Sequence, residues 1–168
     1  MTRMKKILLL LAGLVLLVVA GHHIRLALLS DETLIRMRIE EMAGDFNGGS
    51  VAEVAAGLAE EYRNETSGMD RAQLLQALRY AVLKVRDEKT RRFALRVEVA
   101  VEDLEIAEGE NTAHVMLEVR FSRSRQGEWT GFRDCTIDAD FRKGEAGWQV
   151  TGTRHRWKGG SRGFRLWK

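Results

Sequence analysis

The chain has 168 residues, of which 45% are hydrophobic and 30% are charged, and its formal net charge is +3. A chain of this length and balance builds one domain with its own core, which excludes an intrinsically disordered protein. The single cysteine, Cys135, excludes an intramolecular disulfide and the usual cysteine-based zinc sites, and the absence of proline excludes a Pro-rich linker.

An uncharged apolar segment follows three basic residues at the start of the chain. It covers residues 7–20 and is rich in Leu and Val. The pattern predicts a membrane anchor within residues 1–30 or, alternatively, a signal peptide that is cleaved near Ala20. A buried helix of a soluble protein is a third interpretation.

The basic residues ahead of the apolar segment also predict an orientation. Lys and Arg are enriched on the cytoplasmic side of membrane spans. We therefore expect a single-pass protein of a bacterial-type inner membrane, with a cytoplasmic N-terminus and a periplasmic domain over residues 31–157. Cleavage near Ala20 would instead give a secreted protein.

Two helices are predicted at the start of this domain. Apolar residues recur at helical spacing over residues 34–42, and the Gly48-Gly49 pair ends this first helix. Ser50 and Glu53 have the spacing of a capping box, which predicts a second helix that continues to Tyr62.

A third helix is predicted after a loop over residues 64–68. Asp70 and Gln73 form a second capping-box pattern, and apolar residues repeat at helical spacing from there to Asp87. All three apolar stripes are typical of helices that pack on a core.

From Phe93 the apolar period falls to two, which predicts β-strands joined by short turns into antiparallel hairpins. The apolar parity changes near Asp103, which predicts a bulge in the first strand. Four long strands are expected, over residues 93–106, 113–121, 129–141 and 148–157.

Three short segments give the sequence a resemblance to a known superfamily. They are residues 42–49 (MAGDFNGG), 109–115 (GENTAHV) and 147–150 (GWQV). In this order and spacing they resemble the nuclear transport factor 2-like superfamily, which includes the SnoaL-like cyclases, and the likeness extends over residues 31–157. A cystatin-like sheet on one long helix is the alternative.

The resemblance implies an α+β domain in which three helices pack on a curved antiparallel sheet of about four strands, forming a cone with a pocket inside. It also implies dimerisation through the outer face of the sheet. The superfamily includes dehydratases, isomerases, cyclases and proteins without enzyme activity, so the fold does not select a function. If the cone is open, we expect its lining to include Phe46, Tyr62, Tyr80, Cys135 and Trp148.

No residue pattern predicts a catalytic site, a cofactor or a metal. The enzymes of the superfamily place Asp, His or Tyr inside the cone, but the first helix predicted here has no Tyr. His114 falls on the outward side of its strand, and His155 lies between two arginines without a carboxylate nearby in the sequence. The strand aspartates are expected to face water or to pair with arginines; they are Asp134, Asp138 and Asp140.

Charge is distributed unevenly along the chain. Residues 31–120 contain 12 basic and 19 acidic residues, whereas residues 121–168 contain 11 basic and 5 acidic residues. Basic and aromatic residues alternate in the C-terminal tail, residues 158–168, and in the strand before it. This pattern predicts a surface for anionic lipid or for an acidic protein, with a merely solvated tail as the alternative and no nucleic acid expected. The predicted basic patch consists of Arg154, Arg156, Lys158, Arg162, Arg165 and Lys168.

Two functions are compatible with these features. The first is a membrane-anchored, extracytoplasmic, non-catalytic interaction or scaffold module. The alternative is a small-molecule site in the cone, either binding or weakly catalytic in the manner of an isomerase or dehydratase. A cone filled by its own side chains would favour the first, and an open apolar pocket with convergent polar groups would favour the second.

Overall fold

The computed structural model describes residues 29–107 and 111–158. The chain divides into two compact units, Met1–Leu34 and Ile35–Lys168. In the first unit, the hydroxyl of Ser30 accepts a hydrogen bond from the backbone N–H of Thr33 (3.3 Å), as an N-cap residue does. No helix within the described ranges is long and apolar enough to cross a membrane. The predicted anchor, residues 7–20, lies outside these ranges and stays a prediction.

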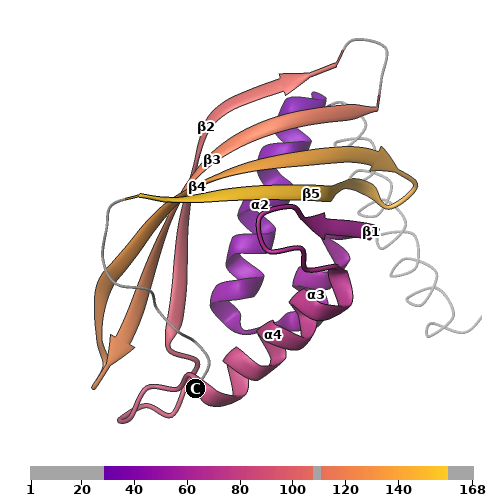
Figure 1. Cartoon of the computed structure of the whole chain (residues 1–168). Helices are drawn as coiled ribbons and strands as arrows, with labels where there is room; N and C mark the ends of the chain where they lie inside the picture. The colour runs from indigo at the N-terminus through magenta and orange to yellow at the C-terminus, as the bar shows by residue number, and fades with distance from the viewer. Residues whose placement is uncertain (1–28, 108–110, 159–168) are drawn as a thin grey trace, which may run out of the picture. The chain divides into compact units, whose positions relative to one another are not determined.

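The described elements form an α+β fold with one five-stranded sheet, in the order β1-β5-β4-β3-β2 (Figure 1). The three predicted helices are present. In chain order the elements are α2 (Asp31–Gly48), α3 (Val51–Ala56), β1 (Leu58–Asn64), α4 (Arg71–Lys84), β2 (Leu95–Ile106), β3 (Thr112–Arg125), β4 (Glu128–Gly144) and β5 (Gly147–Lys158).

The predicted second helix is wrong beyond Ala56. The chain turns at Gly57 and continues as β1, which pairs in parallel with β5. A Cβ added at position 57 would collide with the side chain of Met42, so any residue other than glycine requires Met42 to shift. The Ser50 side chain makes no capping hydrogen bond. Pairing with β5 therefore overrides the local helical pattern, and the sheet has five strands rather than four.

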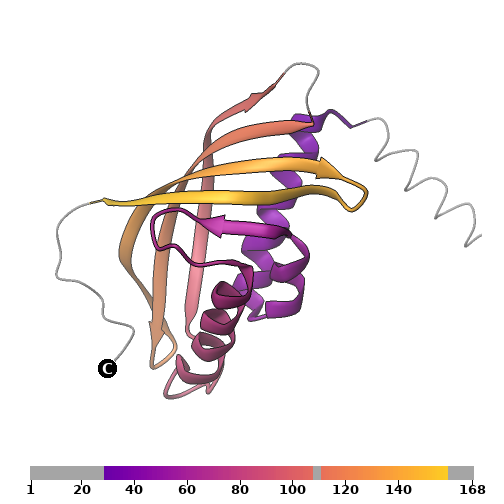
Figure 2. The ribbon, with the colours of Figure 1, turned by 45° about the vertical axis from the view of Figure 1, so that its right-hand side comes forward.

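Strands β2 to β5 form the predicted antiparallel hairpins, and each pair contains one irregularity in register. The β2–β3 shift falls between Val101 and Asp103, which confirms the bulge predicted there. Bulges bend strands and increase their twist. Figure 2 shows the resulting strongly bent strands, with the helices gathered on one side of the sheet.

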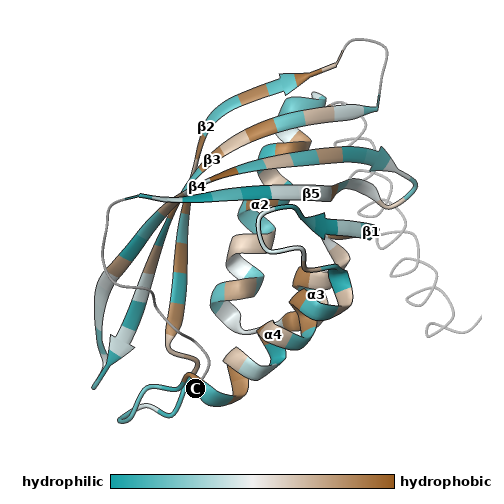
Figure 3. Ribbon diagram, in the orientation of Figure 1, coloured by the Kyte–Doolittle hydropathy of each residue, from teal (hydrophilic) through white to brown (hydrophobic). Residues whose placement is uncertain are grey.

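The core lies between the concave face of the sheet and the helices. Hydrophobic and hydrophilic residues alternate along the strands (Figure 3), as a sheet with one buried face requires. Ile35 of α2, Val115 of β3 and Phe141 of β4 are among the most deeply buried side chains. Trp148 of β5 is also buried, at 3% exposure.

Helix α2 is joined to the edge strand β2 by one side chain. Asn47 donates from Nδ2 to the carbonyl of Val97 (2.9 Å) and accepts at Oδ1 from the N–H of the same residue (2.7 Å). The amide thus pairs with the backbone of β2 as a neighbouring strand would.

A buried carboxylate joins the α4–β2 loop to the β3–β4 hairpin. Asp87 Oδ2 accepts from Ser124 Oγ (2.6 Å) and from the N–H of Gly127 (2.9 Å). Its Oδ1 accepts from the N–H groups of Thr90 (2.7 Å) and Lys89 (3.0 Å). These donors, led by the Ser124 hydroxyl, hold the pKa of Asp87 well below its ordinary range. The sequence pattern identified Asp87 only as the end of the third helix.

Candidate functional site

A cavity of about 400 Å³ lies between the helices and the concave face of the sheet, within the unit Ile35–Lys168. Its walls come from α2, α3, α4 and all five strands. The lining is almost entirely apolar, and helix side chains such as Met42, Phe46 and Leu78 face strand side chains such as Val119 and Ile137. The volume falls within the range of small-molecule sites.

Four polar side chains line one part of this cavity, and they come from the two parallel strands β1 and β5. They are Tyr62, Asn64, Thr153 and His155. Asn64 and Thr153 are direct partners in the β1–β5 register. The Tyr62 hydroxyl lies 2.7 Å from Thr153 Oγ1, which also accepts from Asn64 Nδ2 at 2.9 Å. We call these four residues the polar end of the cavity.

The orientation of the Asn64 amide is determined by the loop that follows β1. Its Oδ1 accepts from the N–H of Ser67 (2.8 Å) and from the Ser67 hydroxyl (2.9 Å). Nδ2 must therefore face the cavity, where it lies 2.9 Å from Thr153 Oγ1 and 3.4 Å from His155 Nδ1. Because Nδ2 can only donate, His155 Nδ1 is the acceptor and Nε2 carries the proton.

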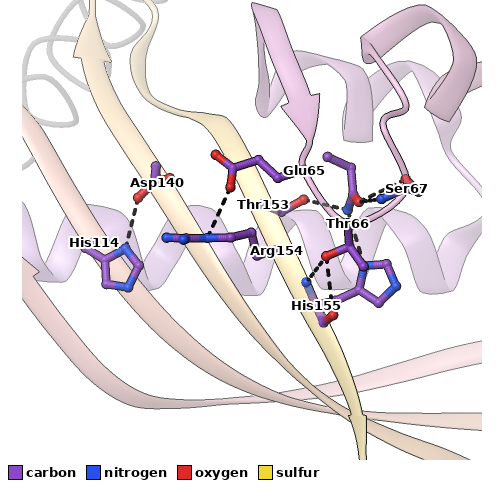
Figure 4. Close-up of polar contacts among 9 residues, drawn as sticks. Glu65, Thr66, Ser67, His114, Asp140, Thr153, Arg154 and His155 are labelled. Carbon is purple, nitrogen blue, oxygen red and sulfur yellow. Dashed lines mark hydrogen bonds and ion pairs between the residues drawn. The ribbon is translucent and has the colours of Figure 1, made fainter.

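The backbone of His155 is held to the segment after β1 (Figure 4). The Thr66 hydroxyl accepts from the N–H of His155 (2.9 Å) and donates to its carbonyl (3.3 Å). The ring is partly buried and lies edge-on to Trp157, with 5.4 Å between centroids. Burial lowers the pKa of His155 from its ordinary value, so the imidazole is neutral at pH 7.

A cluster of aromatic side chains continues from His155 through Trp157. Phe121 and Trp157 line the cavity with centroids 5.8 Å apart, and Phe132 lies 6.3 Å from Phe121. Trp157 is 45% exposed, and the Arg133 guanidinium lies over its ring at 4.4 Å. This edge of the cavity therefore reaches the protein surface.

The five residues expected to line the pocket lie in three places: the cavity, the packed core and the protein surface. Phe46, Tyr62 and Cys135 line the cavity. Trp148 is buried in the core without lining it, and Tyr80 is 43% exposed beside a separate surface depression on α4.

The Cys135 thiol in this cavity is unreactive at neutral pH. Burial raises the pKa of its thiol to about 11, so the thiolate is scarce at neutral pH.

Asn64, Thr153 and His155 were not expected to lie in the cavity. The sequence pattern predicts a loop that begins at Asn64 and a helix over most of the residues that form β1. The alternation of Thr153, His155 and Trp157 along β5 is the available signal, but these residues share a site with Asn64 only when β1 pairs beside them.

The other candidate acid-base residues lie away from the cavity. His114 Nδ1 is 2.9 Å from Asp140 Oδ1 across β3 and β4, and both side chains are nearly half exposed (Figure 4). His114 thus lies on the outward side of its strand, and the sequence pattern did not predict its contact with Asp140. Asp134 pairs with Arg120 at 3.3 Å, as expected of a strand aspartate. None of these side chains lines the cavity, and no group of metal-binding side chains occurs within residues 29–107 and 111–158.

Half of the predicted basic patch falls within the described part of β5. These three side chains are all exposed, and Arg154 pairs with Glu65 (3.3 Å) while Lys158 pairs with Glu118. The other three members, Arg162, Arg165 and Lys168, lie beyond the described residues.

Comparisons with known proteins identify the fold. No protein-family model matches the chain, and no curated protein matches its sequence. Solved structures do match. An NTF2-like (nuclear transport factor 2-like) protein with a cystatin-like fold from Novosphingobium aromaticivorans has a TM-score of 0.62 at 19% identity, covering 84% of this chain and 91% of that one.

Two further matches carry different descriptions. A domain of unknown function with a cystatin-like fold from Nostoc punctiforme has a TM-score of 0.61 at 23% identity, covering 77% of this chain and 78% of that one. A ketosteroid isomerase-like protein from Erwinia carotovora atroseptica has a TM-score of 0.56 at 12% identity, covering 76% and 96%. The domain therefore has the nuclear transport factor 2-like fold, which is called cystatin-like in the descriptions of the first two matches. At identities below 25%, the similarity defines the fold alone.

Proposed function

We propose that this domain binds an apolar small molecule in the cavity between the helices and the sheet. The observation that carries the proposal is an apolar space of about 400 Å³ that the protein's own side chains leave open, with four polar groups at one end. A cavity of about 150 Å³ accepts one benzene, so this one holds about two to three fused rings or an equivalent chain.

Binding fits the lining better than catalysis does. Proton abstraction from carbon needs a base of suitable pKa in contact with the substrate. No Asp or Glu is among the described residues that line the cavity, and Cys135 is protonated at neutral pH. The lone pair of neutral His155, on Nδ1, already accepts from Asn64, so its remaining ring nitrogen can donate a proton but cannot take one. The ketosteroid isomerase-like name of one structural neighbour describes that protein, and the fold does not transfer its activity.

The cellular location that we propose is the one predicted from the apolar N-terminal segment. Residues 7–20 would hold the domain at a bacterial-type inner membrane on the periplasmic side, or would direct its secretion if cleaved near Ala20. Apolar small molecules partition into bilayers, so a membrane-held binding domain would sample them there.

A fluorescent probe tests the binding proposal. N-phenyl-1-naphthylamine is neutral, has two connected aromatic parts and brightens in apolar surroundings. We expect the full-length chain to bind it saturably with one site. Ala43→Phe, which fills the cavity from α2, should abolish this binding, whereas Ala72→Phe on the exposed side of α4 should not. Equal binding by the two variants would place the probe elsewhere and refute the proposal.

An interaction surface at the end of β5 is a second candidate, and one observation favours it. Arg156 and Lys158 are exposed on one face at the end of β5, and the exposed Trp157 lies between them in the sequence on the other face; basic and aromatic residues occur together at surfaces that contact anionic lipid headgroups or acidic proteins. Vesicles of graded anionic-lipid content provide the test. Full-length protein with the six patch residues changed to Ser should bind the vesicles less than the parent, and equal binding would exclude the lipid role.

A homodimer through the outer face of the sheet is a further proposal, which analytical ultracentrifugation would test.

A further inference from the structure

At the polar end of the cavity, some hydrogen-bond donors have no acceptor among the described residues. Thr153 Oγ1 is close to both Tyr62 and Asn64, and Asn64 can only donate to it. The two hydroxyls share one hydrogen bond, which uses one of their two hydrogens. Whichever hydroxyl donates, the other keeps a hydrogen without a partner among the described residues.

His155 supplies a second unused donor. Its Nδ1 accepts from Asn64, so the neutral ring carries its proton on Nε2. Nε2 makes no hydrogen bond to any residue that the structure describes, although the ring lines the cavity. Thr153 and His155 are two apart on β5, so both side chains point to the same face of the strand.

The charge of the lining limits the ligand further. No Lys, Arg, Asp or Glu is among the described lining residues. Arg133, which is not among the lining residues, lies over the Trp157 ring at the aromatic edge. A carboxylate taken into the cavity would lose its hydration without gaining an ionic partner, and burying an unpaired charge is costly.

We infer that the ligand is an uncharged apolar molecule with one acceptor oxygen of the ketone, aldehyde, ester or amide type, which accepts a hydrogen bond from His155 Nε2. This inference rests on the proposed function. A carbonyl oxygen has two lone pairs and so can take both unused donors at the polar end. The apolar remainder of the ligand fills the space between α2, α4 and the sheet.

Three naphthalenes of nearly equal size test the inference with the full-length chain. 2-Ethylnaphthalene has no acceptor, 2-acetylnaphthalene has a neutral one, and 2-naphthoate is an anion. Each is measured by its displacement of N-phenyl-1-naphthylamine. We expect the ketone to bind about tenfold more tightly than the hydrocarbon, as about one to two net hydrogen bonds give, and the anion to bind most weakly.

Two variants assign the effect to one side chain. His155→Phe should lower the roughly tenfold preference for the ketone over 2-ethylnaphthalene, because it removes the Nε2 donor. His114→Phe, on the outer face of the sheet, should preserve the preference.

The outcomes separate this inference from the proposed function. If none of the three compounds displaces the probe, the binding proposal itself fails. If the hydrocarbon and the ketone bind equally, or if 2-naphthoate binds most tightly, binding stands and the inferred ligand class is wrong. Loss of the preference in His114→Phe would also overturn the role given to His155.

Discussion

Replacing Asp87 by Asn should destabilise the domain by removing a buried anion without changing its shape. The carboxylate is 1% exposed, and each of its oxygens accepts two hydrogen bonds. An amide keeps one oxygen and puts an NH₂ group in place of the other. The two groups that donated to the replaced oxygen then face the NH₂ group, which is itself a donor. The Ser124 hydroxyl can turn to accept, but the N–H of Gly127, Thr90 or Lys89 cannot.

The magnitude follows from the number of hydrogen bonds affected. A hydrogen bond to a charged group contributes about 1.5–3 kcal/mol, and the exposed loop N–H groups recover part of this from water. We expect Asp87→Asn to lower the free energy of unfolding by about 2–3 kcal/mol, or the Tm by about 10 °C for a domain of this size. Asp103→Asn is the control. Asp103 is exposed and accepts from the N–H of Leu104, so its change should stay within about 0.5 kcal/mol.

The same carboxylate makes a pH-dependent contribution with a definite sign. Its folded-state pKa lies below the ordinary value of 3.8, so its stabilisation is present above about pH 4 and is lost as the pH falls through the folded-state pKa. Urea unfolding of parent and Asp87→Asn, followed by circular dichroism from pH 7 to pH 3, should show a constant difference down to about pH 4 and a smaller one below. A cost equal to that of Asp103→Asn at pH 7 would refute the role assigned to Asp87.

Three other predictions concern separate parts of the chain. Trp148→Ala should cost about 3–5 kcal/mol in urea unfolding, because Trp148 is 3% exposed in the core, and an unchanged unfolding midpoint would contradict that burial. Asn47→Ala should cost about 1–3 kcal/mol and increase hydrogen exchange at the amide of Val97, and unchanged exchange there would rule out the α2–β2 link. If residues 7–20 form an uncleaved anchor, the protein should resist carbonate extraction from membranes; a mature chain that starts at Gly21 in mass spectrometry would exclude the anchor.

Local patterns sufficed to predict much of this fold. Alternation of apolar residues identified β2 to β5, the change of parity near Asp103 identified the bulge, and short turns made the strands antiparallel. The capping box of Asp70 and Gln73 forms as predicted at the start of α4. These features depend on residues within a few positions of one another, so their physical cause is visible in the sequence.

Strand β1 is the element that local sequence patterns predict wrongly. Leu58 and Tyr62 are four residues apart, which is the spacing of a helix, and both are buried in a strand instead. Helix and strand compete closely in so short a segment. The decision comes from hydrogen bonds to β5, about ninety residues away, such as that from the N–H of Val150 to the carbonyl of Gly57 (2.9 Å).

The candidate site was decided by the tertiary structure for the same reason. The sequence by itself determined that the sheet would have an apolar inner face, and it placed Tyr62 and Cys135 among the pocket candidates. Only the parallel pairing of β1 with β5 brings Asn64 beside Thr153 and His155 and leaves donors unused in an apolar cavity. Neither strand carries that chemistry alone, because the contacts Tyr62–Thr153, Asn64–Thr153 and Asn64–His155 each join a side chain of β1 to a side chain of β5.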